Sequence, residues 1–235
     1  MNTGSLFKND SLKKFSINEY PLHKVIANLF DTEDLSNLHN KSATVDEYNQ
    51  DLGKDSNTPF HSIFYKSIKE ESSSLRILWD KFLKEVVNTH FQKENPLIVQ
   101  SLPSLRIHVP GAKAINRWHF DSDPDHMHPL GEINCLVPLT AMFGTNSVWR
   151  ESEPGKSDFR PFELSKGDMV YWDGNRCTHG NHKNETTKSR LSLDFRIFPR
   201  EKYISYRSKA SKHKKKSATT GREFVIGSYY QEINK

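Results

Sequence analysis

The second half of the chain is a series of short β-rich runs with no helical pattern between them. The runs cover residues 97–99, 104–109, 133–139, 168–172, 191–198 and 223–230. Turn residues separate them, among them Pro110-Gly111, Pro154-Gly155 and Gly167-Asp168. Many short strands joined by turns pack as two layers or close into a barrel. The sequence therefore predicts a mainly β fold, a closed sandwich or barrel, with flanking helices.

The first part of the chain has apolar residues at helical spacing instead. One apolar stripe consists of Leu22, Val25, Ile26 and Leu29. The run 61–91 carries a longer stripe, which predicts one long helix or two shorter ones, and the polar segment 43–59 is expected to be a loop. We expect residues 1–95 to form a helical N-terminal extension that packs on a β core of residues 96–235, within one structural unit.

Composition limits the classes of protein that the chain can belong to. Its 235 residues fit one domain, and no apolar run approaches the roughly 20 residues of a membrane span. No apolar segment of the signal-peptide type opens the chain. The two cysteines, Cys135 and Cys177, are expected to be reduced thiols, with a disulfide as the alternative. We therefore expect a cytoplasmic location, with no association with membranes.

The net charge of +5 is concentrated in one run, residues 207–216, which holds six lysines and arginines. Its charges repel one another and it has almost no apolar content, so a mobile, solvated surface loop is expected. A patch for nucleic acid or for an acidic substrate is the alternative, but no aromatic residues are interleaved through the run for base stacking.

Three residues form a candidate metal site. His119 and Asp121 are separated by one residue in a β-rich stretch. On a strand, both side chains would therefore point to the same side. His179 follows another apolar strand. Two imidazoles and one carboxylate can occupy one face of Fe(II) and leave the opposite positions open. We predict that His119, Asp121 and His179 bind one iron ion, and purely structural histidines are the alternative.

Other polar residues surround this motif. The nearby histidines are expected to be solvated or hydrogen-bonded, with a pocket-lining role open for His108 and for the loop around His126; they are His108, His126, His128 and His182. Four acids are either solvated or form an acidic mouth for an amine-bearing substrate; they are Asp123, Asp125, Glu151 and Glu153.

Arg190 and Ser192 share one face of a predicted strand. A guanidinium makes two parallel hydrogen bonds to a carboxylate, and a neighbouring hydroxyl adds a third donor. The pair therefore suits the distal carboxylate of a keto acid that chelates iron at its other end. Arg196 continues the same face, and three roles stay open for it: pairing with Asp194, contact with a substrate, or contact with the other end of the keto acid.

His119-Phe120-Asp121, His179 and Arg190-Leu191-Ser192 resemble the Fe(II)/2-oxoglutarate-dependent dioxygenases. From about residue 105 to 198 the chain is similar to the branch named for a streptomycin-biosynthesis protein, close to the phytanoyl-CoA dioxygenase type. The stretches 131–134, 138–140 and 145–152 support the match. The resemblance implies a double-stranded β-helix of the jelly-roll type. It also implies Fe(II), 2-oxoglutarate and O₂ as cofactor and co-substrates, with CO₂ and succinate as co-products.

The resemblance also implies residue roles. His119, Asp121 and His179 are the expected catalytic metal ligands, and the expected cofactor-binding residues are Arg190, Ser192 and Asn134. The expected substrate-binding residues are Arg106, His108, Asn146, Trp149, Glu151 and Arg196. Because Asp121 is present where halogenating relatives carry a small residue, hydroxylation is expected, or the related desaturation or cyclisation. The implied substrate is a small polar metabolite of the amino acid, amino sugar or cyclitol class.

Two alternative functions remain at this point. Arg190 and Arg196 are spaced as in AlkB-like nucleic-acid demethylases, although the spacing from His179 to Arg190 is shorter than in that group. A non-catalytic β-barrel with a structural metal is the other alternative, but an Arg-Ser pair placed for a carboxylate has no purpose there. A small-molecule substrate is expected, nucleic acid is not expected as a partner, and the sequence does not indicate an oligomeric state.

Overall fold

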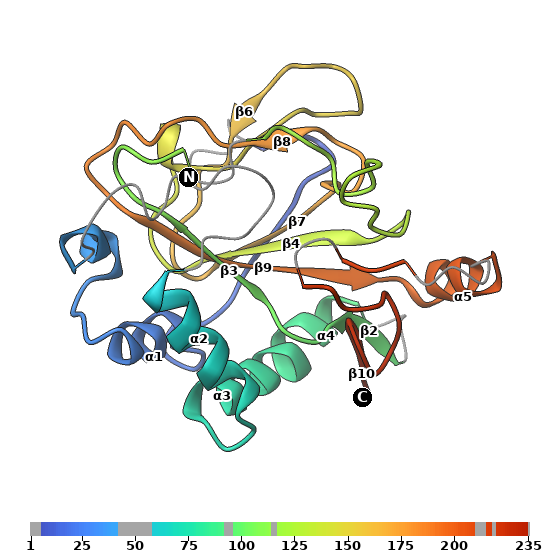
Figure 1. The fold of residues 1–235 in the computed structure, drawn as a ribbon, viewed down its shortest axis with the longest axis horizontal. Helices are drawn as coiled ribbons and strands as arrows, with labels where there is room; N and C mark the ends of the chain where they lie inside the picture. The colour runs from blue at the N-terminus through green and yellow to red at the C-terminus, as the bar shows by residue number, and fades with distance from the viewer. Residues whose placement is uncertain are drawn as a thin grey trace.

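The core of the protein is a pair of antiparallel β-sheets (Figure 1). The computed structural model describes residues 6–41, 58–91, 96–113, 117–209, 215–217 and 220–234. The larger sheet has the order β1-β7-β4-β9-β2-β10, with β3 also paired to β9, and the smaller sheet has the order β6-β5-β8. The strands are β1 (Ser11–Lys14), β2 (Leu97–Gln100), β3 (Ser104–His108), β4 (Ile133–Pro138), β5 (Trp149–Arg150), β6 (Arg160–Pro161), β7 (Asp168–Trp172), β8 (His179–Gly180), β9 (Arg190–Phe198) and β10 (Tyr230–Ile233).

Five of the predicted strands, β2, β3, β4, β7 and β9, are confirmed within one or two residues. The final predicted strand, 223–230, is wrong in position, because β10 begins only at Tyr230. A turn precedes it. Gly227 has φ +83°, a conformation that favours glycine, and its N–H donates to the carbonyl of Tyr230. Phe224 and Tyr229, two of the aromatic residues that suggested a strand, instead pack in a small apolar cluster with Ile98.

The α-helices of the described residues all precede β2, except the last of them. They are α1 (Leu22–Leu29), α2 (Pro59–Lys69), α3 (Ser74–Phe82), α4 (Asn88–His90) and α5 (Arg200–Lys209), with a π-helical turn at Leu83–Val87 and 3₁₀ turns at Leu35–Lys41 and Gly144–Asn146. The predicted helical run 61–91 is two helices because Thr58 and Ser73 each cap a new start. Their hydroxyls accept from the N–H groups of His61 and Arg76. Of the predicted polar loop, residues 43–57 lie outside the described residues.

The N-terminal part is not wholly helical. Residues 11–14, which the helical interpretation included, form β1 at the edge of the larger sheet and pair with β7. Lys14 Nζ lies 2.5 Å from Asp168 Oδ1 across that pair. Strand pairing prevails here because β7 otherwise ends the sheet with unpaired backbone groups. The division of the chain at residue 95 stays a prediction.

Alternation along β9 decides which face of the sheet meets the helices. Leu191, Leu193, Phe195 and Ile197 belong to the main apolar core, together with residues of α1, α2 and α3. Trp79 of α3 meets Phe195 edge-on, with ring centroids 5.2 Å apart. Figure 1 shows α1, α2 and α3 on one side of the larger sheet and the smaller sheet on the other. The opposite face of β9 therefore points into the space between the two sheets.

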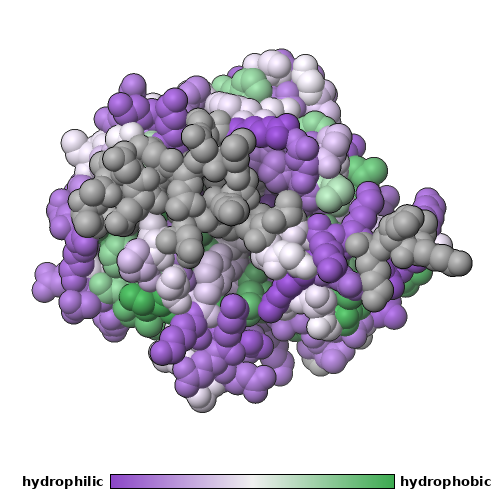
Figure 2. Space-filling model, in the orientation of Figure 1, coloured by the Kyte–Doolittle hydropathy of each residue, from purple (hydrophilic) through white to green (hydrophobic). Residues whose placement is uncertain are grey.

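The lysine-rich run begins in a helix rather than in a loop. Residues 207–209 are the last turn of α5, residues 210–214 lie outside the described residues, and Lys216 pairs with Glu223 in an isolated bridge. Figure 2 shows hydrophilic residues over much of the visible face, with hydrophobic residues in small separate groups. In the described part of the chain, no helix is both long enough and apolar enough to cross a membrane.

Candidate metal centre

The polar face of β9 lines the space between the sheets. Arg190, Ser192, Asp194 and Arg196 point there, since they alternate with the apolar residues of the core. In the register of the sheet, Asn134 of β4 lies opposite Arg196. All of these residues except Ser192 line one cavity, together with His119 and His179.

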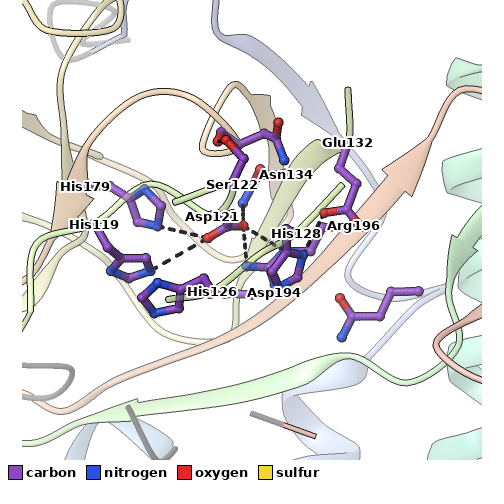
Figure 3. A network of polar contacts seen from close by, with 12 residues as sticks. His119, Asp121, Ser122, His126, His128, Glu132, Asn134, His179, Asp194 and Arg196 are labelled. Carbon is purple, nitrogen blue, oxygen red and sulfur yellow. Dashed lines mark hydrogen bonds and ion pairs between the residues drawn. The ribbon is translucent and has the colours of Figure 1, made fainter. Parts of the chain in front are cut away.

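The three predicted metal ligands come together at one end of this cavity. His119 and His179 face each other through two backbone hydrogen bonds, of 3.0 Å and 2.8 Å. Their Nε2 atoms lie 3.7 Å and 3.6 Å from Oδ1 of Asp121. One possible ligand atom from each residue lies within 4.8 Å of the others, and in the described part of the chain this is the one group of three or more acidic, His or Cys residues so arranged. Figure 3 shows both imidazoles directed at the same carboxylate oxygen.

Both imidazoles are oriented and protonated as metal ligands need. Nδ1 of His119 donates to the carbonyl of Arg117, and Nδ1 of His179 donates to the carbonyl of Cys177, each over 3.0 Å. Nε2 therefore keeps its lone pair in each ring. Burial, assisted by the neighbouring His179, lowers the pKa of His119 to about 3, and burial also lowers the pKa of His179. Neutral rings with free Nε2 atoms beside one carboxylate oxygen fit Fe(II).

The second oxygen of Asp121 is held by donors from two strands. Asn134 Nδ2 donates to Oδ2 over 2.7 Å, and Arg196 donates to it from Nε and Nη2 over 3.1 Å and 2.7 Å. Burial alone would raise the pKa of Asp121, but Arg196 together with His128 holds that pKa well below its usual value. Asp121 is thus a carboxylate with Oδ1 left to face the histidines. Arg196 bonds to Asp121, an arrangement that none of the three roles left open by the sequence included.

Two glycines let these side chains approach closely. A Cβ atom at Gly174 would lie 2.7 Å from Nδ2 of Asn134, and one at Gly180 would lie 2.7 Å from the Trp118 ring. Both contacts are shorter than side chains tolerate, so any larger residue at Gly174 would displace a donor to Asp121. Sequence reasoning missed Gly174, which has no signal of its own besides its place in the turn before His179.

Arg190 is a buried cation at the other end of the cavity. Its guanidinium donates to the carbonyl of Asn146 (3.1 Å), to Oγ of Ser192 (3.2 Å) and to Oδ1 of Asn181 (2.8 Å). Burial lowers its pKa to about 10, so it stays charged at neutral pH. Within the described residues it forms no ion pair with a carboxylate. A buried charge held only by neutral partners suits an anionic ligand.

The predicted substrate residues differ in where they lie. Arg106 lines the cavity and has Nε 3.4 Å from Oδ2 of Asp194. His108 is buried between the carbonyls of Asn146 and Ala112, and Asn146 holds Arg190 through its backbone. The side chains of His108 and Asn146 are thus placed behind the anion site, and neither residue lines the cavity.

Trp149 and Glu151 also have partners within the protein. Trp149 Nε1 donates to the carbonyl of Gly144 over 3.0 Å. The carboxylate of Glu151 is buried and accepts from the N–H groups of Ser157 and Thr178. Glu151 therefore anchors the segment that leads into His179. Among the cavity-lining residues that sequence reasoning missed are His61, Trp172 and Asn181.

The histidines that follow the triad form a second layer. His126 stacks on His119, with ring centroids 4.1 Å apart, and bonds to Asp123. His128 bonds to the buried carboxylate of Glu132 over 2.7 Å. They are the hydrogen-bonded histidines that the sequence analysis expected. Asp123 and Glu151 already accept several hydrogen bonds from the protein, so neither supports the acidic mouth that the sequence left as an alternative.

Comparison with known proteins agrees with this geometry. No known family profile matches the chain. It is 29% identical to streptomycin biosynthesis protein StrG of Streptomyces griseus over 222 residues, which is 94% of this chain and 96% of that protein. Its fold is similar to that of AviO1 from Streptomyces viridochromogenes Tue57 (TM-score 0.51, 16% identity, 82% of this chain and 90% of that one). It is also similar to the non-heme monooxygenase ThoJ in its Ni complex (TM-score 0.50, 13% identity, 97% of this chain and 86% of that one).

These likenesses confirm two predictions. The two packed antiparallel sheets are the predicted double-stranded β-helix. The match to StrG over nearly the whole of both chains confirms the resemblance to the branch named for a streptomycin-biosynthesis protein. The His-Asp-His donor set fits Fe(II), and the buried guanidinium of Arg190 fits a carboxylate of 2-oxoglutarate.

Proposed function

We propose that this 2-oxoglutarate-dependent non-haem iron dioxygenase hydroxylates a small polar metabolite in a biosynthetic pathway. One observation carries the proposal: the two neutral imidazoles of the His-Asp-His group, His119 and His179, line the same cavity as Arg190, a buried guanidinium with no acidic partner among the described residues. A structural metal site has no use for the second of these. A keto acid that chelates iron with one end and meets a cation with the other uses both.

In this proposal, His119, Asp121 and His179 hold Fe(II), and Arg190, which donates to the hydroxyl of Ser192 behind it, holds the distal carboxylate of 2-oxoglutarate. When bound, the iron and the keto acid supply activation of O₂ coupled to decarboxylation of the keto acid to succinate. A His-Asp-His set of this kind would hold the iron from one face and leave the opposite positions for the keto acid and O₂.

Asn134 and Arg196 act as positioning residues for Asp121. Three donor contacts to Oδ2 leave only Oδ1 toward the metal, which favours coordination through one oxygen. A bidentate carboxylate would fill a position that O₂ or the keto acid needs. The positive charge of Arg196 also balances the charge of the buried carboxylate, so Asp121 stays ionised beside two neutral imidazoles.

The substrate class rests on the relative with the near-complete match. StrG is a streptomycin biosynthesis protein, which favours amino acid, amino sugar or cyclitol substrates for this chain. Asp121 at the ligand position favours transfer of a hydroxyl group, with desaturation or cyclisation as the related outcomes.

The proposal is tested by succinate release. The chain, loaded anaerobically with Fe(II) and 2-oxoglutarate, is exposed to O₂ with and without a panel of amino acids, amino sugars and cyclitols. We expect succinate formation that requires iron and is stimulated by members of the panel, with a product heavier by one oxygen atom. Absence of succinate under every condition would leave a non-catalytic barrel, and stimulation only by methylated oligonucleotides would favour the demethylase alternative.

A further inference from the structure

A second cavity lies beside the metal site. It has a volume of about 560 Å³ and is formed by α2, the connection from β2 to β3, and the C-terminal segment around Arg222 and Tyr229. His61 of α2 lines both cavities. Ser104, at the start of β3, lines the second cavity, and Arg106, on the same side of that strand, lines the first. The two spaces are therefore neighbours along α2 and β3.

The two cavities differ greatly in size. The metal-site cavity measures only about 60 Å³, which leaves no room for a metabolite beside a keto acid. The second cavity, by contrast, falls within the several hundred Å³ typical of small-molecule sites. The body of a substrate that presents one carbon atom to the metal must extend into neighbouring space, and this cavity provides it.

The second cavity is positively charged. Lys66, Lys69 and Arg222 line it, and none of the described residues that line it is acidic. Arg222 is fixed in place, because its Nη1 donates to Oγ of Ser101 and to the carbonyl of Ser228. In the described residues Lys66 and Lys69 form no ion pair.

Neutral hydrogen-bonding groups complete the lining. They belong to Ser62, Tyr65, Gln100, Ser101, Ser104 and Thr220. Hydroxyls and amides suit a polyhydroxylated molecule, and three cations without an acid suit a group with two negative charges. A carboxylate carries one charge and is matched by a single guanidinium, as at Arg190, whereas a phosphate monoester carries nearly two at neutral pH.

We propose that this cavity binds the phosphate group of the substrate, which is a phosphate monoester of a small polyhydroxylated molecule. The proposal rests on the proposed oxygenase function and specifies its substrate class. Lys66, Lys69 and Arg222 hold the phosphate, the hydroxyl and amide groups contact the body of the molecule, and the carbon to be oxidised reaches past His61 toward the metal site. The positive charge of this cavity is opposite in sign to the acidic mouth that the sequence left as an alternative.

Binding of inorganic phosphate, glucose phosphate and glucose is measured by calorimetry on the full chain without iron, so that phosphate has no metal to ligate. The test variant is Lys66→Gln with Lys69→Gln. Its matched control is Lys24→Gln with Lys84→Gln, which removes two exposed lysines that line neither cavity. Lys66→Arg with Lys69→Arg keeps the charge. Circular dichroism shows that each variant is folded.

We expect both phosphates to bind and glucose to bind more weakly. The dissociation constant should rise at least about tenfold in the glutamine variant, stay unchanged in the control and be largely restored by arginine. Saturating 2-oxoglutarate should not displace phosphate. Equal binding by wild type and glutamine variant, or displacement by 2-oxoglutarate, overturns the proposal; the second result would place phosphate at Arg190. Stronger lysine-dependent binding of an oligonucleotide would overturn it in favour of nucleic acid.

Turnover provides an independent arm. Phosphorylated members of the substrate panel should stimulate succinate release at lower concentration than their unphosphorylated forms, and the glutamine variant should raise the KM for them with little change in kcat. Basal succinate release from 2-oxoglutarate alone tests the oxygenase function separately. If basal release is present and phosphate has no effect in either arm, the cavity assignment fails while the oxygenase stands.

Discussion

The two faces of β9 are both buried, yet they are opposite in chemistry. Toward the helices, Leu191, Leu193, Phe195 and Ile197 are all fully covered by apolar neighbours. Toward the smaller sheet, the same strand presents Arg190, Ser192, Asp194 and Arg196, most of them equally inaccessible to water. One strand thus serves as the centre of the core and as the wall of the metal site.

The difference shows how stability and chemistry are divided. Burying four large apolar side chains contributes on the order of 2 kcal/mol each, whereas each desolvated guanidinium costs free energy that its partners must offset. The ion pair with Asp121 offsets this desolvation cost for Arg196, whereas the hydrogen-bond partners of Arg190 are all neutral. The apolar face therefore stabilises a polar face that is itself unfavourable without its ligands.

The largest expected effect comes from His179. His179→Ala removes one of the three proposed ligands, so succinate release should fall below detection while thermal unfolding changes little. His182→Ala is the control, because that neighbouring histidine is exposed and lies outside the triad. Full iron occupancy together with wild-type turnover in His179→Ala would show that the ligand set is wrong.

On the apolar face, Phe195→Ala should act on stability instead. Phe195 is fully buried against Trp79, and truncating such a ring costs about 3 to 5 kcal/mol of unfolding free energy. Chemical denaturation measures that loss, and Phe195→Leu should lose less. Turnover per folded molecule should stay close to wild type at low temperature. A large loss of turnover in a fully folded variant would show that the two faces are not separable.

Arg190 tests the anion site. Arg190→Ala should cost about 2 to 5 kcal/mol of 2-oxoglutarate binding, since a desolvated charge pair is lost. The apparent constant for 2-oxoglutarate should therefore rise by more than about tenfold. Arg190→Lys should keep part of the binding, because it retains the charge and loses the fork. If Arg196→Ala has the larger effect on 2-oxoglutarate and Arg190→Ala has none, the anchor has been misassigned.

Arg196 should affect the metal more than the keto acid. Arg196→Met leaves Asp121 without its cationic partner, and loss of such an outer contact typically weakens metal binding by about 10- to 100-fold. Titration with Co(II), followed by its absorption, measures the affinity without turnover. Arg196→Lys should fall between wild type and Arg196→Met. Arg176→Met, which removes an exposed arginine paired with Asp173, is the control. Unchanged Co(II) affinity in Arg196→Met would contradict the positioning role.

The smallest expected effect is a pH dependence of stability at His108. Burial, assisted by the charge of Arg190, lowers its pKa from the model-peptide value 6.5 to about 4 in the folded state. Between these values the unfolded chain binds more protons than the folded one, so stability should fall as pH falls from 6.5 to about 4, by at most about 1.4 kcal/mol per pH unit. Denaturation at several pH values should show a shallower slope for His108→Asn. An unchanged slope would assign the acid sensitivity to other groups.

The sequence by itself determined much of this centre. Alternation with period two is local, so His119 with Asp121 and Arg190 with Ser192 could each be placed on one strand face from neighbouring positions alone. The β-rich run 191–198 likewise predicted β9, which carries Arg190 and Ser192, whereas His119 lies in an isolated bridge and Asp121 in a turn. Where the local signal was ambiguous, as in residues 11–14 and 223–230, pairing partners elsewhere in the chain decided the outcome.

Tertiary structure alone decided the second layer and the second cavity. Arg196 reaches an aspartate 75 positions away, and Gly174 matters only because Asn134 of a neighbouring strand needs its space. His61, on a helix far from the motifs, joins two cavities. Sequence spacing records which side of its own strand or helix a residue faces. It does not indicate which residues pack against that side, because this depends on how sheets and helices from distant parts of the chain stack on one another.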